Sequence, residues 1–205
     1  ITCYETSISI NPEYAIAHFN LGEALQAQNK LNQAKFSYLT AIDLNPRLLE
    51  PYLNLAKIWQ LKGDINAAIE ILQRCLKICP SQVKAINELG IFYKALGDLD
   101  SAFSCFKQTL NFEPANTTAN IELINIYRHY HDLSKALEHC ELISNLNPKS
   151  LEIMSIEIFL KKQICDWSHK EKATEFLDRI VEDSFPINPM TVLSLEDSPS
   201  LELKL

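Results

Sequence analysis

The chain has 205 residues, a formal net charge of −7 and 47% apolar residues. The apolar content can supply a core and excludes a wholly disordered chain. The acidic balance argues against nucleic acid, because phosphate backbones bind lysine- and arginine-rich surfaces. No uninterrupted apolar run approaches the roughly 20 residues of a membrane-spanning helix. We therefore expect neither nucleic acid nor a membrane as a partner.

The prolines reveal the organisation of the chain. Five of the nine are spaced by 34 residues, and a fixed period of this size indicates internal repeats. These are Pro12, Pro46, Pro80, Pro114 and Pro148. We number each repeat from the third residue after its proline. This numbering predicts the end of a preceding repeat over 1–14, four repeats over 15–48, 49–82, 83–116 and 117–150, an incomplete capping repeat over 151–167, and a junction helix with the start of a further domain over 168–205.

The same kinds of residue recur at the same positions of each repeat. Position 7 is leucine in all four complete repeats, position 8 is small in the first three, and position 20 is always alanine. Apolar residues spaced by three or four predict one helix over positions 1–13 and a second over positions 15–28. One helix pair cannot bury its own apolar face, but stacked pairs can. The predicted fold class is therefore all-α, a right-handed superhelical solenoid of antiparallel helix pairs.

Local residue choices fit this division. Gly63 and Gly97 lie in the predicted turn between the two helices, where a positive φ is least costly for glycine. Asp64 and Asp98 follow them as predicted N-caps of the second helices. Small residues at positions 8 and 20 are expected to let the helix backbones approach closely. Bulky residues at positions 11 and 24 would fill the space beside them.

Cysteine and histidine residues give no sign of a metal site or a disulfide framework. Three of the six cysteines fall at core positions of the repeat, so we expect reduced, buried thiols in a cytoplasmic protein. They are Cys75, Cys105 and Cys140. Cys79 follows Cys75 by one helical turn, but no matching second pair completes a metal site. His129, His131 and His139 fall on two helices and a turn and are expected at the surface. No metal and no cofactor is predicted.

The repeated columns resemble the tetratricopeptide repeat, with its bulky residue, Leu, Gly or Ala, Tyr, Ala, aromatic, Ala and Pro. The resemblance covers about 150 residues. In that family the concave face, formed by the first helices, binds a protein or an extended peptide, so the resemblance implies such a partner here. The residues it places on this face are Phe19, Asn20, Glu23, Leu53, Asn54, Lys57, Asn87, Glu88, Ile91, Lys94, Glu122, Asn125 and Arg128.

Two features of this face leave alternatives open. Asn20 and Asn54 offer the donors and acceptors that match a peptide main chain, but they could equally be solvated polar residues. A basic column at position 12 could hold acidic side chains, or could be solvated or paired with nearby glutamates. This column consists of Lys94, Arg128 and Lys162.

One subclass of the family clamps a C-terminal carboxylate of its ligand. Asn54 and Lys84 would fit parts of that clamp. Phe19, Glu23 and Glu88 occupy the other places, and a glutamate would repel a carboxylate. A clamp of this kind is not predicted.

The segment after the repeats resembles the junction between the repeat arm and the catalytic region of O-linked N-acetylglucosamine transferases and SPINDLY-like relatives. The motif Cys165-Asp166-Trp167 stands at positions 15–17 of the incomplete repeat, where that family has it. An upstream repeat also matches the family's residue pattern, at His18-Phe19-Asn20-Leu21-Gly22. The resemblance implies a substrate-recruiting arm of a protein O-glycosyltransferase whose catalytic domain lies beyond Leu205. No catalytic residue is predicted within 1–205. The alternatives are a free-standing adaptor without enzymatic activity and a chance Cys-Asp-Trp triplet whose Trp seals the last repeat.

Overall fold

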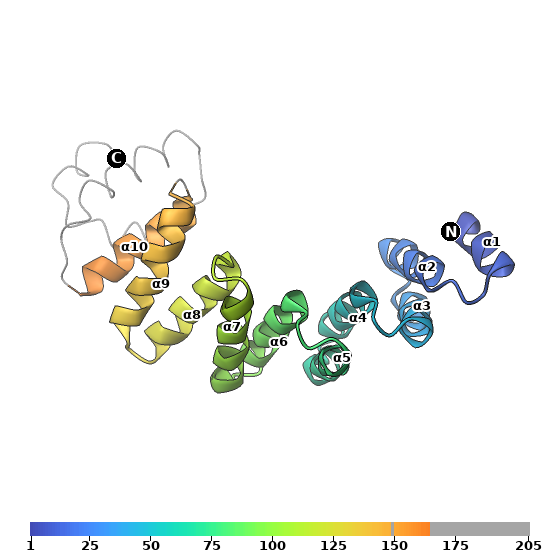
Figure 1. The fold of residues 1–205 in the computed structure, drawn as a ribbon, viewed down its shortest axis with the longest axis horizontal. Coiled ribbons are helices and arrows are strands. Elements are labelled where there is room, and N and C mark those ends of the chain that lie inside the picture. The colour runs from blue at the N-terminus through green and yellow to red at the C-terminus, as the bar shows by residue number, and fades with distance from the viewer. Residues whose placement is uncertain (149, 165–205) are drawn as a thin grey trace. The chain divides into compact units, whose positions relative to one another are not determined.

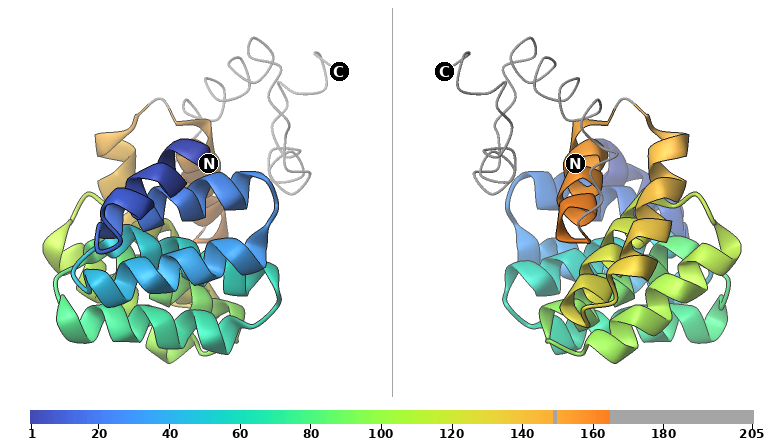
Figure 2. Two further views of the ribbon diagram at one scale, coloured as in Figure 1. Left: turned by 90° about the vertical axis from the view of Figure 1, so that its right-hand side faces the viewer. Right: turned by 90° about the vertical axis from the view of Figure 1, so that its left-hand side faces the viewer.

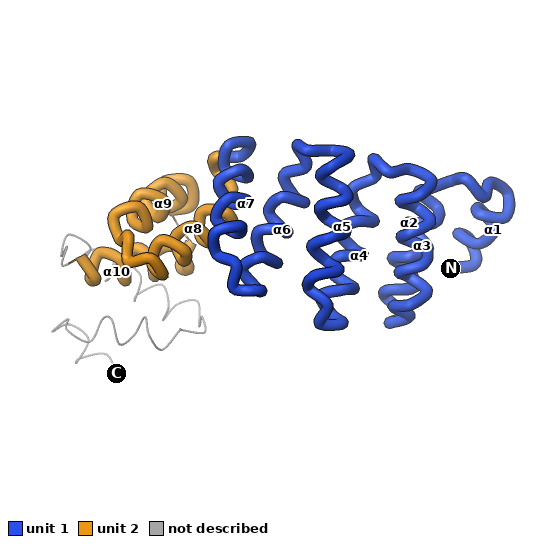
Figure 3. Tube along the Cα trace, turned by 90° about the horizontal axis from the view of Figure 1, so that it is seen from below, with its two compact units in different colours: residues 1–113 blue, residues 114–205 orange. Residues whose placement is uncertain are grey.

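The computed structural model describes residues 1–148 and 150–164, and all regular secondary structure in this part of the chain is α-helix (Figure 1). It divides into two compact units, one of residues 1–113 and one from residue 114 onward (Figure 3). The first unit contains α1 (Thr2–Ile10), α2 (Ala15–Ala27), α3 (Leu31–Leu44), α4 (Leu49–Leu61), α5 (Ile65–Ile78), α6 (Val83–Ala95) and α7 (Leu99–Phe112). The described part of the second contains α8 (Thr117–His129), α9 (Leu133–Leu146) and α10 (Leu151–Gln163).

Helix pairs stack in chain order within the first unit. The pairs are α2 with α3, α4 with α5, and α6 with α7, and the second helix of each pair also packs against the first helix of the next. The short helix α1 lies beside α2 (Figure 2). In the second unit α9 packs against both α8 and α10. The predicted all-α class and the stacking of helix pairs are therefore confirmed.

The first helices occupy positions 1–13 of the repeats, as predicted, but the second helices do not occupy positions 15–28. They begin at position 17 and end at position 30. The reason lies in the turn. Position 15 has a positive φ in each complete repeat (59° at Asn29, 78° at Gly63, 81° at Gly97 and 59° at His131), so the second helix cannot start there. Position 16 is the N-cap, and helical geometry starts one residue later.

Side-chain caps fix the starts of most of these helices. Asp64, Asp98 and Asp132 each accept a hydrogen bond from the backbone N–H three residues on, at 3.0 to 3.2 Å. Hydrogen bonds from the side chain and then from the backbone N–H of the residue three positions on lower the pKa of Asp98 and of Asp132. Lys30 occupies the same position before α3 and makes no side-chain cap hydrogen bond. The first repeat therefore lacks a stabilising contact that the other three have.

Glycines at position 8 accommodate an aromatic ring of the same repeat. A methyl group added at Gly22 would lie 2.5 Å from Tyr38 Cε1, and one added at Gly90 would lie 2.8 Å from Phe106 Cε1. The close approach that the small residue permits is thus between the first helix and the side chain at position 24.

The other repeats reveal an exchange of volume between positions 8 and 24. The second repeat has Ala56 with Leu72, and the fourth has Ile124 with Cys140; all four side chains are buried. A larger residue at position 8 thus accompanies a smaller one at position 24. Because protein interiors are close-packed, such an exchange keeps the space filled. The unusual Ile124 and Cys140 of the fourth repeat therefore form a compensated pair.

Position 4 of three repeats holds the loop that contains the spaced proline. Tyr52 Oη donates to the carbonyl oxygen of Pro46 at 3.1 Å, and Asn120 Nδ2 donates to that of Pro114 at 3.1 Å. His18 Nε2 lies 2.9 Å from the carbonyl oxygen of Pro12. Three different side chains thus satisfy the carbonyl six residues earlier. The sequence columns did not predict this contact, because the three residue types share no obvious property.

Burial confirms some residue assignments and corrects others. Cys75, Cys105 and Cys140 are buried and belong to no disulfide, and desolvation raises the pKa of Cys75 and of Cys105 to about 11. His139 is half-buried and not a surface residue, since its Nδ1 lies 2.7 Å from Asn120 Oδ1 and its ring stacks on Tyr127. The apolar column at position 30 is exposed, with accessible fractions between 38% and 79%. Its members are Ile10, Leu44, Ile78, Phe112 and Leu146.

Candidate functional site

The residues predicted to bind a ligand all lie on first helices of the repeats. In the first unit α2 carries Phe19, Asn20 and Glu23, α4 carries Leu53, Asn54 and Lys57, and α6 carries Asn87, Glu88, Ile91 and Lys94. In the second unit α8 carries Glu122, Asn125 and Arg128. Each is half-buried or exposed. We call the surface formed by the ten residues of the first unit the first-helix face.

A hydrogen-bonded network joins two repeats on the first-helix face. Tyr38 Oη donates to Gln26 Oε1 at 2.8 Å and accepts a hydrogen bond from Asn54 Nδ2 at 3.3 Å. Asn54 Nδ2 also donates to Glu23 Oε1 at 3.5 Å. These four residues and Ala27 line a hollow of about 360 Å³. Side chains from α2, α3 and α4 therefore converge on one polar hollow.

Tyr38 is the buried centre of this network. Burial raises the pKa of its hydroxyl to about 12, the hydrogen bond from Asn54 lowers it, and the charge of Glu23 raises it. The hydroxyl is therefore protonated at neutral pH and can donate to Gln26. The Phe19 ring lies 5.9 Å from the Tyr38 ring, centroid to centroid, and places an apolar surface beside Tyr38.

The network determines what the hollow can offer a ligand. Both Asn54 Nδ2 bonds are internal, so Asn54 presents its carbonyl oxygen as an acceptor. Gln26 uses its oxygen for Tyr38, so its amide nitrogen can donate outward. An acceptor and a donor at one place match the N–H and C=O of a peptide unit. Asn54 is thus an ordered part of a polar network, while the Asn20 side chain makes no hydrogen bond within the described residues.

Another hollow, of about 430 Å³, lies within the second unit. Asn125, Arg128 and His129 of α8 line it together with His131, Leu133 and Gln163. The Arg128 guanidinium carbon lies 4.5 Å from the centre of the Phe159 ring on α10. Asn125 and Arg128 are the two predicted ligand-binding residues that the structure brings together here.

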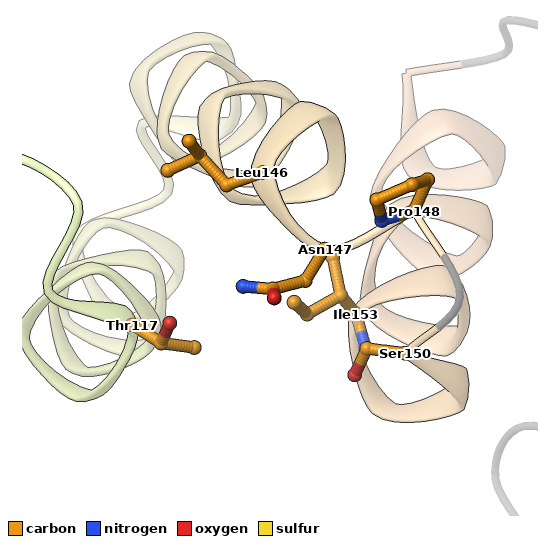
Figure 4. Close-up of a pocket in the computed structure, with 6 residues that line it drawn as sticks. All are labelled: Thr117, Leu146, Asn147, Pro148, Ser150 and Ile153. Carbon is orange, nitrogen blue, oxygen red and sulfur yellow. The ribbon is translucent and has the colours of Figure 1, made fainter.

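The second unit also has a cleft where the end of α9 meets the first residues of α8 and α10 (Figure 4). Six residues line it, namely Thr117, Leu146, Asn147, Pro148, Ser150 and Ile153, around a volume of about 530 Å³. The Ser150 side chain caps α10 by accepting from the backbone N–H of Ile153 at 3.5 Å. The Ser150 hydroxyl at the cleft's edge thus serves the fold, and none of the lining residues that the structure describes is charged.

Sequence reasoning missed three residues. Tyr38 was assigned to the core alone, and Gln26 was not among the predicted ligand-binding residues, although the Tyr38 hydroxyl connects Gln26 to Asn54. A signal existed, since a tyrosine hydroxyl at a buried position needs a partner. Glu157 stands where the complete repeats have leucine, and it is 1% exposed. Lys161 Nζ lies 2.9 Å from one of its oxygens, and Ser144 Oγ donates to the other at 2.9 Å.

The described residues show no sign of a metal site or of a membrane-spanning helix. Within residues 1–148 and 150–164, no three His, Cys, Asp or Glu side chains are grouped so that they could hold a metal ion. No helix in the same residues has the length and apolarity that a membrane span requires. The Cys165-Asp166-Trp167 motif and the predicted junction helix lie outside the described residues.

Comparison with known families matches the repeats directly. A model described as "TPR repeat" matches residues 1–29, and one described as "Tetratricopeptide repeat" matches residues 49–82 and 83–116. No curated protein sequence matches the chain. The family models thus support tetratricopeptide repeats at these residues, while a likeness to glycosyltransferases stays a prediction.

Solved structures resemble the chain over most of its length. PilF of Pseudomonas aeruginosa is 15% identical, with a TM-score of 0.75, covering 97% of this chain and 86% of that one. YrrB, described as a TPR protein with an unusual peptide-binding site, is 19% identical, with a TM-score of 0.68 and coverage of 94% and 96%. MamA of Desulfovibrio magneticus RS-1 is 18% identical, with a TM-score of 0.66 and coverage of 82% and 93%. At these identities the similarity establishes the fold.

Proposed function

We propose that this chain of tetratricopeptide repeats holds an extended polypeptide segment of a partner protein against its first-helix face. A scaffold for protein interaction is the function that the repeat fold itself supports. The observation that carries the proposal is the polar hollow between α2 and α4. There Asn54 presents an acceptor and Gln26 a donor, next to the apolar ring of Phe19. The peptide-binding site named for YrrB adds support by analogy.

The main chain is the part of a ligand that this arrangement suits. An extended peptide presents one N–H and one C=O per residue whatever its sequence. Asn54 would accept from such an N–H, Gln26 would donate to such a C=O, and Phe19 would cover an adjacent apolar side chain. Binding would then combine backbone hydrogen bonds with modest sequence preference, as in other modes of extended-peptide recognition.

Asn54→Ala is expected to weaken binding of an extended peptide by about tenfold, because it removes the outward acceptor and the hydrogen bond to Tyr38. The measurement is a calorimetric titration of the 205-residue chain with peptides selected from a random library. Asn66→Ala is the matched control, since Asn66 is an exposed asparagine on the second helix α5. Equal losses in the two variants, or none in Asn54→Ala, would contradict the proposal.

A more specific proposal is that the chain is the substrate-recruiting arm of a protein O-glycosyltransferase. Its support is the sequence Cys165-Asp166-Trp167, in phase with the incomplete repeat. A free-standing adaptor is equally compatible with the fold. The gene sequence beyond Leu205 distinguishes them. A two-lobed α/β pattern followed by transfer activity from a nucleotide sugar would support the arm, and a stop codon or unrelated sequence would remove it.

We also propose a cytoplasmic location. Its support is the pair of buried thiols at Cys75 and Cys105, neither of which forms a disulfide, because such thiols suit a reducing compartment. Fractionation of the source cells would test it. Recovery of the protein in an oxidising compartment would overturn it.

A further inference from the structure

We infer that the hollow around Arg128 in the second unit is a subsite for a carboxylate group of the bound polypeptide. This inference rests on the proposed function, because it assigns a chemical preference to one part of the ligand. The subsite is distinct from the polar hollow between α2 and α4, and its residues come from α8, the turn after it, the start of α9 and the end of α10.

The Arg128 guanidinium is held in place without being neutralised. Its central carbon lies 4.5 Å from the centre of the Phe159 ring, so a cation–π contact holds the guanidinium over the ring. Within the described residues it forms no hydrogen bond and no ion pair. Its N–H groups, which lie in the plane of the guanidinium, are therefore available to a ligand. A planar fork of donors fits a carboxylate with two parallel hydrogen bonds.

The surroundings of Arg128 suit an anionic group of moderate size. None of the described residues that line this hollow of about 430 Å³ has an acidic side chain. His129, His131, Asn125 and Gln163 all carry groups that can donate hydrogen bonds. The positive charge of Arg128, with hydrogen-bond donors around it, matches the single negative charge of a carboxylate.

A second role for Arg128 must be weighed against this one. Arg128 and His129 lie in the last turn of α8, where a cation offsets the partial negative charge of the helix C-terminus. That role accounts for a basic residue at this place. It does not account for the stack on Phe159 or for the hollow lined by donors, and it predicts no response to a ligand.

The test uses three tripeptides and the 205-residue chain labelled with ¹⁵N. Acetyl-Gly-Glu-Gly-amide carries a side-chain carboxylate, acetyl-Gly-Gly-Gly carries a C-terminal one, and acetyl-Gly-Gln-Gly-amide is neutral. At low salt we expect at least one acidic tripeptide to shift the Arg128 Nε–Hε resonance with millimolar affinity, and the neutral one to leave it unchanged. Whichever acidic peptide binds identifies the source of the carboxylate. No shift, or an equal shift with the neutral peptide, would overturn the inference.

Arg128→Gln is expected to weaken binding of the acidic tripeptide about tenfold or more, because a charge-assisted bidentate contact is lost. Lys77→Gln is the control, since Lys77 is an exposed cation in the last turn of α5. If both variants bind alike, the subsite is wrong. If Arg128→Gln leaves binding unchanged while Asn54→Ala weakens it, the subsite is overturned and the proposed function stands. The reverse result would overturn the proposed function alone.

Discussion

Replacing Phe106 by alanine is expected to lower the free energy of unfolding by about 3–5 kcal/mol, the usual cost of truncating a buried aromatic side chain. Phe106 is fully buried, and its ring occupies the space that the missing side chain of Gly90 leaves open. Removing the ring would leave a cavity between α6 and α7. Urea denaturation followed by circular dichroism measures the change.

A double variant tests the physical reason for this effect. Gly90→Ile with Phe106→Cys reproduces the pair found at Ile124 and Cys140 of the fourth repeat. We expect it to be more stable than Phe106→Cys alone, because the isoleucine refills the cavity. By contrast, Gly90→Ile alone should destabilise the chain, since even one methyl group would lie 2.8 Å from the ring. A double variant no more stable than Phe106→Cys would contradict the exchange of volume.

Replacing Lys161 by methionine is expected to cost about 3–5 kcal/mol, because it removes the ammonium group from a buried ion pair. Lys161 Nζ lies 2.9 Å from Glu157 Oε1, and Glu157 is 1% exposed. The carboxylate would stay buried with less compensation. The same denaturation experiment measures the loss in the second unit.

The matched control removes both charges. Glu157→Leu with Lys161→Met restores the leucine that position 7 has in Leu21, Leu55, Leu89 and Leu123. Replacing a buried ion pair by apolar residues of similar volume is often neutral or stabilising by about 1–4 kcal/mol. We therefore expect the double variant to be at least as stable as the unmodified chain. A double variant as unstable as Lys161→Met would show that the pair is not the source of the loss.

Structure that follows from the residue type at a single repeat position could be predicted from the sequence. The first helices, the caps at Asp64 and Asp98, and the positive φ at Gly63 and Gly97 follow from local chemistry, and all are confirmed. Contacts that join unlike residue types could not be predicted. His18, Tyr52 and Asn120 perform the same task at position 4 with three different side chains.

The candidate site was predictable only in outline. The repeat pattern placed Glu23 and Asn54 on the same face, but it could not show that Tyr38 connects Asn54 to Gln26 through its hydroxyl. That link depends on how two neighbouring repeats pack, and the residue pattern within one repeat does not indicate which side chains of the next repeat it contacts. For the same reason the stack of Arg128 on Phe159, which joins two repeats, escaped prediction.

Site-specific photocrosslinking tests the central claim, that an extended polypeptide lies against the first-helix face. A benzoylphenylalanine is placed at Lys57, which is exposed on α4 one turn from Asn54, or at Glu70, which is exposed on the second helix α5. Each variant is irradiated with a peptide selected from a random library. The account predicts that the peptide crosslinks at position 57 and not at position 70. Equal crosslinking at both positions, or crosslinking at position 70 alone, would contradict it.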